Sequence, residues 1–224
     1  MKKMAVVTGA NRGIGLAFCR QLVNEGYKVV GICRQSSAEL NKLDIRVINK
    51  IDFSDLEAIK NINKNLNHEP IDLLINNAGI GLQDDIQNLD FTKIHQHFFT
   101  NACGPLAVTL SLLPSMKPKS KIAFISSRLS SVTDNSSSGS YSYRMSKAAL
   151  NMCAKNLSID LKDKGIAVAA LSPGMVDTDM LRVLGITQGA DAAMVVTRLM
   201  KIIDNLNLEN TGTFWHVDGS VLSW

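Results

Sequence analysis

Short apolar runs alternate with longer amphipathic stretches along the whole chain. Seven runs rich in β-branched or apolar residues predict strands, at residues 4–7, 28–32, 45–51, 71–75, 121–125, 166–171 and 213–217. Between them, apolar residues recur with a period of about 3.6, which predicts helices over residues 13–25, 54–66, 90–113, 143–163 and 189–204. This alternation is typical of βαβ units, in which helices cover a parallel sheet.

The strand predicted at residues 166–171 is apolar at every position. Such a strand is expected to be covered on both faces, as in parallel sheets. No linker, internal repeat or change in composition divides the chain. We therefore predict one α/β domain over residues 1–224, a doubly wound sheet of about seven parallel strands with helices on both faces.

Composition and charge exclude several classes of protein. Of the 224 residues, 46% are hydrophobic and 20% are charged, which excludes a disordered or collagen-like chain. The net charge of +4 is spread along the sequence, so nucleic-acid binding, which needs a concentrated basic stripe, is not predicted. No apolar run reaches the ~18 residues of a membrane span, and the run after Lys3 is too short for a secretion signal.

The cysteines and histidines do not predict disulfides or a metal site. The four cysteines are isolated, with no C-x-x-C pair, and are interpreted as reduced thiols of a cytoplasmic protein. His95 and His97 lie two positions apart on a predicted helix, and therefore on different faces. We predict no metal ligand.

A glycine-rich segment follows the first strand. Residues 8–15 read Thr-Gly-Ala-Asn-Arg-Gly-Ile-Gly, a spacing that either lets the backbone turn tightly beside a pyrophosphate or forms an ordinary flexible turn. Arg34 follows the second strand, with no acidic residue before Glu39. An acid there would bind the ribose of NAD(H), whereas Arg34 and Arg12 favour the 2′-phosphate of NADP(H). The alternative is that both arginines are simply solvated.

Polar segments also follow the other predicted strands. Asp52 follows the third strand, where it either contacts an adenine together with Phe53 or belongs to a helix N-cap region. Residues 76–79 follow the fourth strand and residues 172–178 the sixth. Ser126 and Ser127 end the fifth strand, where a hydroxyl either orients a substrate carbonyl or forms a turn. Because the carboxyl ends of parallel strands share one edge, we expect these segments to converge.

Two predicted helices carry further candidate chemistry. Pro105 has no N–H to donate to the carbonyl of Asn101, four residues earlier. One interpretation is that this carbonyl oxygen accepts from an ordered water. The other is that the helix kinks or ends at the proline for packing. Tyr143 and Lys147 are four positions apart, which places them on one face of a helix. A neighbouring ammonium favours the phenolate and lowers a phenol pKa that starts at about 10, although this spacing also occurs by chance.

In this order, the motifs resemble the short-chain dehydrogenase/reductase family over essentially the whole chain. The resemblance is carried by Thr8, Gly9, Gly13, Gly15, residues 76–79, Asn101, Ser127, Tyr143, Lys147, Pro173 and Gly174. Residues 125–128, 143–151 and 218–224 further resemble sniffer-type and C-factor-like carbonyl reductases. The resemblance implies a Rossmann-type fold and an enzyme that interconverts a carbonyl and an alcohol.

The resemblance also implies roles for single residues. Tyr143 would exchange a proton with the carbonyl oxygen, and Lys147 would lower the phenol pKa and bind the cofactor ribose. Ser127 would orient the carbonyl, with Ser126 or Ser130 as alternatives. Asn101 would anchor a water that connects Lys147 to solvent. Cofactor contacts are implied for Gly9, Asn11, Arg12, Gly13, Ile14, Gly15, Arg34, Asp52, Asn77, Ala78, Gly79, Tyr143, Lys147, Pro173, Gly174, Val176 and Thr178.

Expected partners follow from the same resemblance. One is a small carbonyl substrate. The others are further copies of the chain, in a homodimer or homotetramer formed through the helices near residues 91–113 and 143–163. No nucleic acid or membrane partner is expected. An alternative function is a signalling or regulatory protein that binds the dinucleotide with little or no turnover, to which the C-factor-like resemblance points.

Overall fold

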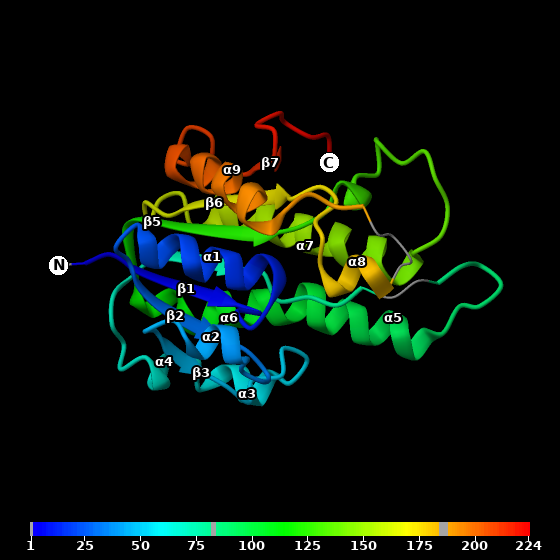
Figure 1. The fold of residues 1–224 in the computed structure, drawn as a ribbon. Coiled ribbons are helices and arrows are strands. Elements are labelled where there is room, and N and C mark those ends of the chain that lie inside the picture. Colours follow the sequence, from blue (N-terminus) through cyan, green and yellow to red (C-terminus); the bar gives the residue numbers. More distant parts are fainter. Residues whose placement is uncertain (1, 82–83, 184–187) are drawn as a thin grey trace.

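The computed structural model describes residues 2–81, 84–183 and 188–224. In these residues seven parallel strands form one sheet with the order β3-β2-β1-β4-β5-β6-β7 (Figure 1). The strands are β1 (Met4–Thr8), β2 (Lys28–Ile32), β3 (Arg46–Ile48), β4 (Ile71–Asn76), β5 (Met116–Ile125), β6 (Ala167–Ser172) and β7 (Thr213–His216). The predicted Rossmann-type, doubly wound sheet is confirmed.

The direction in which strands are added reverses at the centre of the sheet. β1 pairs with both β2 and β4, so the chain continues outward on one side through β3 and on the other through β7. The strand arrows in Figure 1 point to the same side, which places all the carboxyl ends at one edge. In open α/β sheets, ligands bind at this edge beside the reversal.

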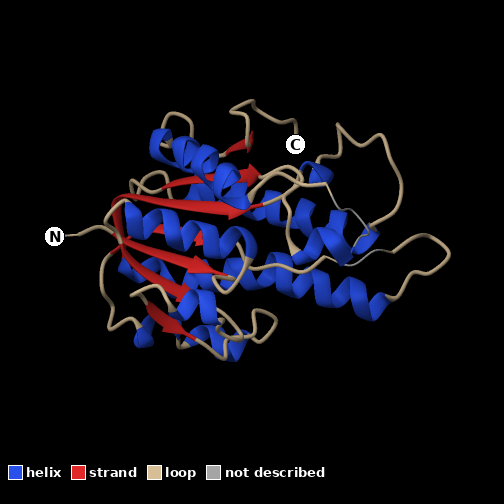
Figure 2. Ribbon diagram, viewed as in Figure 1, coloured by secondary structure: helices blue, strands red, loops and turns tan. Residues whose placement is uncertain are grey.

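Helices cover both faces of the sheet (Figure 2). One face is covered by α1 (Gly13–Asn24), α2 (Ala38–Asn41) and α9 (Ala192–Asn205), and the other by α3 (Leu56–Lys60), α4 (Ile62–Asn65), α6 (Gly104–Leu112) and α7 (Tyr141–Asp160). Because of this double cover, all residues of β6 are buried, as its apolar sequence predicts. No helix in the described part of the chain is long and apolar enough to span a bilayer.

Several elements differ from their predicted bounds. The helix predicted over 54–66 is interrupted at Asn61, where α3 ends and α4 begins. The helix predicted over 90–113 divides into α5 (Phe91–Phe98), the π-helical turn η1 (Phe99–Cys103) and α6, because Pro105 lacks the N–H that a continuous α-helix requires. β5 begins at Met116, before its predicted start at Lys121. Short elements without a predicted counterpart are α2, α8 (Asp179–Val183), η2 (Leu113–Ser115) and η3 (Arg128–Ser130).

Candidate active site

The glycine-rich segment joins β1 to α1 in a turn that has no room for side chains. A Cβ atom added at Gly15 would lie 2.1 Å from the Gly9 carbonyl oxygen, and one added at Gly9 would lie 2.9 Å from Ala78 Cα. Gly9 and Gly13 have positive φ angles of 65° and 52°, which favour glycine. The first turn of α1 has no acidic residue and no side-chain cap, so its free N–H groups fit the phosphates of a dinucleotide.

The loop after β4 is bonded to this turn. The Thr8 hydroxyl accepts hydrogen bonds from the backbone N–H groups of Asn77 and Ala78, both at 3.0 Å. The side-chain amide of Asn77 donates to the carbonyl oxygens of Thr8 and Gly9 at 3.0 and 3.3 Å. These hydrogen bonds join the segment after β1 to the segment after β4. The two strand ends therefore lie together, as predicted from the parallel sheet.

The side chain of Asn101 connects this loop to α7. Its Oδ1 accepts from the Ile80 N–H at 2.8 Å, and its Nδ2 donates to the Ile80 carbonyl at 2.9 Å and to Ser146 Oγ at 3.0 Å. Asn101 lies fully buried in η1. Reasoning from the sequence considered the carbonyl oxygen of Asn101 and missed its side chain, for which the signal was a polar residue inside an otherwise apolar helix.

Lys147 lies where the β4 loop, η1 and α7 meet. Its Nζ is 5.8 Å from the centroid of the Tyr143 ring, on the same side of α7, and donates to the Ile125 carbonyl at 2.7 Å. A Cβ added at Gly79 would lie 3.6 Å from this nitrogen and 3.1 Å from Asn101 Oδ1. Lys147 is only 4% exposed, and burial lowers its pKa to about 8.

The pKa of Tyr143 is shifted in the direction opposite to the expected one. Burial raises the pKa of the phenol, and a hydrogen bond with the Ser127 side chain opposes this shift. Lys147 is not among the causes of this shift, so the predicted lowering of the phenol pKa by this lysine stays a prediction. Desolvation is the larger of the two causes, and the ammonium of Lys147 donates its hydrogen bond to the Ile125 carbonyl.

The structure distinguishes the three candidate serines at the end of β5. Ser126 and Ser130 are buried and share Asn151, whose Oδ1 accepts from Ser126 Oγ at 2.6 Å and whose Nδ2 donates to Ser130 Oγ at 2.6 Å. Ser127 is half-buried, and its Oγ accepts from the Leu129 N–H at 3.2 Å; its side chain also lies close enough to the Tyr143 phenol to lower the pKa of that group. Of the three hydroxyls, the structure therefore brings that of Ser127 to the phenol.

The segment after β6 lies against the glycine-rich turn. Pro173 follows β6 directly, and Gly174 has a φ angle of 71°. The Thr178 hydroxyl donates to the Val176 carbonyl at 3.2 Å, and a Cβ added at Gly13 would lie 3.1 Å from Thr178 Cγ2. The residues predicted from the first and sixth strand ends are therefore brought together.

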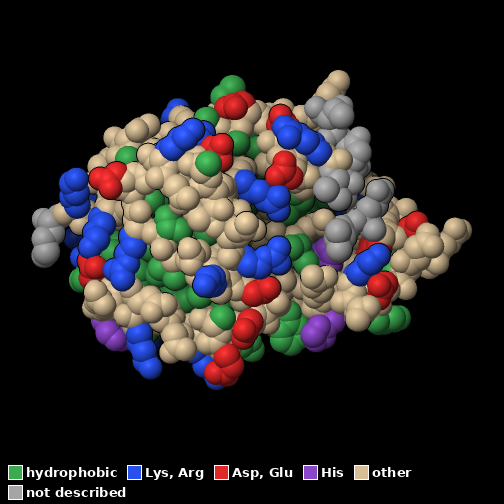
Figure 3. Space-filling view, turned by 60° about the horizontal axis from the view of Figure 1, so that its bottom comes forward, with side chains coloured by type: hydrophobic (Ala, Val, Ile, Leu, Met, Phe, Trp, Pro, Cys, Tyr) green, Lys and Arg blue, Asp and Glu red, His purple; other side chains and the backbone are tan. Residues whose placement is uncertain are grey.

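Acidic residues lie beside both arginines that are predicted to select NADP(H). Arg12 forms an ion pair with Asp179 of α8 at 2.9 Å, and Arg34 lies 3.9 Å from Asp52. The sequence shows no acidic residue between Arg34 and Glu39, but Asp179 and Asp52, which are distant in sequence, fold next to the two cations. On the face drawn in Figure 3, basic and acidic side chains are interspersed.

Asp52 does not cap a helix. The N-cap of α3 is Asp55, whose side chain accepts from the first turn. Asp52 accepts instead from the backbone N–H and the hydroxyl of Ser54, at 2.9 and 2.7 Å. These hydrogen bonds, with a smaller contribution from Arg34, lower the pKa of its carboxyl.

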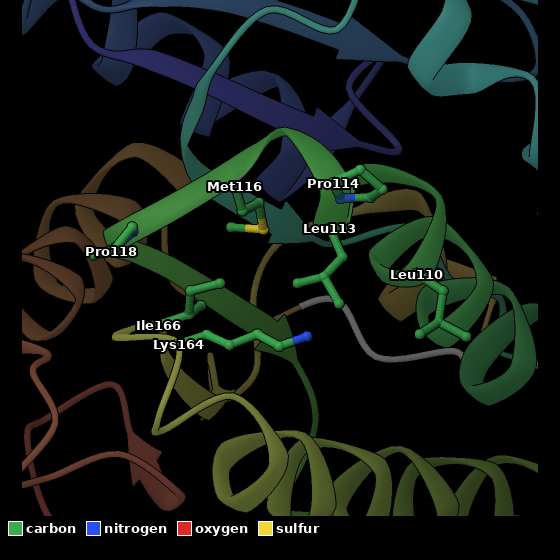
Figure 4. A pocket seen from close by; sticks show the side chains of 7 residues that line it. All are labelled: Leu110, Leu113, Pro114, Met116, Pro118, Lys164 and Ile166. Atoms are coloured by element: carbon green, nitrogen blue, oxygen red, sulfur yellow. The ribbon is translucent and has the colours of Figure 1, made fainter.

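A cavity of about 410 Å³ lies away from this site. It is lined by Leu110, Leu113, Pro114, Met116, Pro118, Lys164 and Ile166 (Figure 4). Met116 begins β5 and Ile166 precedes β6, so this cavity is at the amino edge of the sheet, opposite the candidate residues.

Among the described residues, no cluster of three or more His, Cys, Asp or Glu could hold a metal ion. His95, one of the two histidines of the predicted helix, stacks on Phe99, with ring centroids 4.4 Å apart.

The fold and the strand-end site are those of a dinucleotide-dependent oxidoreductase, and comparisons with known proteins define the class further. A sequence model described as "short chain dehydrogenase" matches residues 3–189. The 1-hydroxy-2-glutathionyl-2-methyl-3-butene dehydrogenase of Rhodococcus sp. (strain AD45) is 34% identical over 222 residues, which cover 98% of both chains. C-signal of Myxococcus xanthus is 38% identical over 162 residues, covering 69% of this chain and 93% of that protein.

Several solved structures match over the whole chain. The NADPH-bound carbonyl reductase from chicken fatty liver has a TM-score of 0.88 and 29% identity, covering 100% of this chain and 99% of that one. The carbonyl reductase Sniffer of D. melanogaster has a TM-score of 0.88 and 26% identity, with 100% of both chains covered. This chain therefore belongs to the short-chain dehydrogenase family, and its resemblance to the sniffer-type and C-factor-like proteins is confirmed. The alternative of a purely regulatory protein is not favoured, because three of these four relatives are named as oxidoreductases.

Proposed function

We propose that this protein is an NADPH-dependent carbonyl reductase that converts a small or medium-sized ketone or aldehyde into an alcohol. The observation that carries the proposal is the meeting of Ser127, Tyr143 and Lys147 at the carboxyl edge of the sheet. The glycine-rich turn at the same edge fits a dinucleotide. The NADPH-bound state of the chicken carbonyl reductase supports the choice of cofactor.

A dinucleotide bound at this edge would supply the hydride for the carbonyl carbon. Tyr143 retains its proton at neutral pH, because burial raises the phenol pKa, and donates it to the carbonyl oxygen. Ser127 directs that oxygen towards the phenol by a hydrogen bond. Lys147, protonated below its pKa of about 8, stabilises the phenolate left by proton transfer.

We further propose that Lys147 binds the cofactor ribose. An ammonium has three N–H donors, and the Ile125 carbonyl takes one of them. The others suit ribose hydroxyls and a water bound by the Asn101 carbonyl oxygen, the role predicted for that residue.

Replacing Tyr143 by Phe tests the proposed reaction. NADPH oxidation with a reactive dicarbonyl compound is expected to fall to background, while the Kd for NADPH, measured by fluorescence titration, stays within about twofold of the wild-type value. Tyr141→Phe, at the start of the same helix, is the control and is expected to retain turnover. Unchanged turnover in Tyr143→Phe would remove the proposed acid, and a wild-type protein that binds NADPH but reduces no member of a broad carbonyl panel would favour a regulatory role.

Cofactor preference is a separate part of the proposal. We expect NADPH to bind at least ~10-fold more tightly than NADH, a difference of about 1.4 kcal/mol, through Arg12 and Arg34. Arg34→Ala is expected to reduce this ratio and to leave the Kd for NADH nearly unchanged. Equal dissociation constants for the two cofactors in the wild-type protein would contradict the assignment.

Oxidation of an alcohol is a second candidate reaction. It is favoured by the Rhodococcus relative, which is named as a dehydrogenase of a glutathionyl alcohol and matches 98% of this chain. Turnover of a hydroxylated glutathione conjugate with oxidised cofactor, at a higher kcat/KM than any carbonyl reduction, would support this candidate. Absence of that turnover beside active carbonyl reduction would exclude it.

We also propose a cytoplasmic homodimer or homotetramer. Met145, Met152 and Ile159 of α7 are 51%, 62% and 64% exposed, and their seven-residue spacing places them on one side of the helix. Phe98 and Leu110, on α5 and α6, are also exposed. A second copy would remove these apolar side chains from water, so Ile159→Lys is expected to shift the mass measured by light scattering towards the monomer. A monomeric wild-type protein would contradict this assembly.

A further inference from the structure

The helix that carries Tyr143 starts from an unfavourable backbone conformation. Gly139 and Ser140 have φ angles of 81° and 52°, so two consecutive residues are left-handed just before α7. Residues with a side chain rarely adopt this region and retain it where surrounding contacts enforce it. Ser140 is the N-cap of α7, yet its side chain makes no capping hydrogen bond. Another group must therefore hold the start of this helix.

Asp84, in the loop after β4, makes the missing contacts. Its backbone carbonyl accepts from the Ser140 N–H at 2.7 Å. Its Oδ2 accepts from the Ser142 N–H at 3.0 Å and also from the Ser142 hydroxyl. Asp84 is only 6% exposed, and Ser142 is 1% exposed. A carboxylate at this place satisfies a free N–H group of the first turn and is favoured by the helix dipole. Asp84 thus caps α7 from 58 residues away in the sequence.

These contacts bear directly on Tyr143, which follows Ser142 in the chain. In the same loop after β4, Asn77 and Ala78 are hydrogen-bonded to Thr8 of the glycine-rich turn. Described residues of this loop therefore contact both the glycine-rich turn and the first turn of α7. A displacement of this turn would move the phenol relative to the glycine-rich turn.

We propose that Asp84 is a positioning residue, which caps α7 and thereby holds Tyr143 in place for proton transfer. The catalytic consequence rests on the proposed function of the protein. The capping itself does not, and it can be measured without turnover.

Hydrogen–deuterium exchange of the first turn of α7 measures the capping. In Asp84→Ala, exchange of the amides of residues 141–145 is expected to rise at least about tenfold, because both side-chain contacts to Ser142 are lost. Asp84→Asn keeps an acceptor oxygen and is expected to restore most of the protection. Asp85→Ala is the matched control, since this neighbouring exposed carboxylate accepts from its own turn, and its exchange is expected to equal that of the wild type.

Steady-state kinetics with NADPH and a carbonyl substrate measure the positioning. In Asp84→Ala, kcat is expected to fall about tenfold or more while the Kd for NADPH stays within about twofold, and Asp84→Asn is expected to recover most of kcat. Wild-type exchange in Asp84→Ala overturns the proposal, and so does raised exchange with an unchanged kcat. If the wild-type protein shows no turnover, the proposed function fails and the exchange result alone decides the capping. If Asp84→Ala does not fold, Ser142→Ala gives the same two measurements with a smaller expected effect.

Discussion

The buried ammonium of Lys147 makes the stability of the protein depend on pH. Burial lowers the pKa of this lysine from 10.5 to about 8. Between these values the unfolded chain still binds a proton that the folded chain has lost, so the free energy of unfolding rises with pH. Lys147→Met removes the titrating group and keeps a long, unbranched side chain, and should therefore remove this contribution to the pH dependence.

The expected magnitude follows from the two pKa values. Their difference corresponds to about 3 kcal/mol at about 1.36 kcal/mol per pKa unit, and this cost is fully present below pH 8, where both chains are protonated. At pH 9.5 the cost has fallen to about 1.4 kcal/mol, because the folded lysine is already neutral. Relative to Lys147→Met, the wild type is therefore expected to gain about 2 kcal/mol between pH 7 and pH 9.5. The lost hydrogen bond to the Ile125 carbonyl adds about 1–2 kcal/mol in favour of the wild type, to a similar extent at both pH values.

Urea unfolding at pH 7 and pH 9.5 measures this difference. Lys155→Met is the matched control, because Lys155 is exposed on the same helix, and its difference from the wild type is expected to be the same at both pH values. If the difference between the wild type and Lys147→Met is also independent of pH, the reasoning about the buried ammonium is refuted. A pH-dependent difference would show that this lysine is retained at a cost in stability at neutral pH.

Two further pairs of substitutions separate chemistry from packing. Ser127→Ala is expected to lower kcat/KM about 100-fold. Ser130→Ala breaks buried hydrogen bonds and is expected to lower the unfolding free energy by about 1–2 kcal/mol with little kinetic effect; equal kinetic losses would contradict the assignment of Ser127. Gly15→Ala places Cβ 2.1 Å from the Gly9 carbonyl oxygen and is expected to cost at least about 3 kcal/mol, roughly 10 °C in Tm. Gly26→Ala meets no atom within 4 Å and is expected to cost only about 1–2 kcal/mol from its positive φ; equal Tm losses would show that close packing at Gly15 is not the cause.

Features that depend on short sequence separations could be predicted from the sequence. The apolar run of β6 and the alternation of strands and helices predict the parallel sheet, because a strand covered on both faces needs no polar positions. Tyr143 and Lys147 lie on one side of α7, because four positions are about one helical turn. The break at Asn61 and the π-helical turn before Pro105 depend on local backbone preferences that hydrophobic periodicity does not resolve.

Contacts between distant segments could not be predicted in the same way. Nothing in the sequence places Asp84 beside Ser142, or Asp179 beside Arg12, because such residues meet only when the elements that carry them have packed. The choice of Ser127 among the serines at the end of β5 also depends on a distant contact, because Asn151 of α7 binds the hydroxyls of Ser126 and Ser130. The sequence therefore predicts which residue types gather at the edge, whereas the folded chain determines how they are paired.

The pairing of the two arginines affects the proposed preference for NADPH. Arg12 and Asp179 are 70% and 52% exposed, and Arg34 and Asp52 are 80% and 47% exposed. Exposed ion pairs contribute about 0–1 kcal/mol each, whereas a phosphate binds arginine through stronger, charge-assisted hydrogen bonds. A tenfold preference corresponds to about 1.4 kcal/mol, which is comparable with the free energy needed to break both pairs. NADPH is therefore preferred only if the arginine–phosphate contacts are stronger than the two ion pairs combined. All four side chains are exposed, which keeps each ion pair weak and so favours the preference for NADPH.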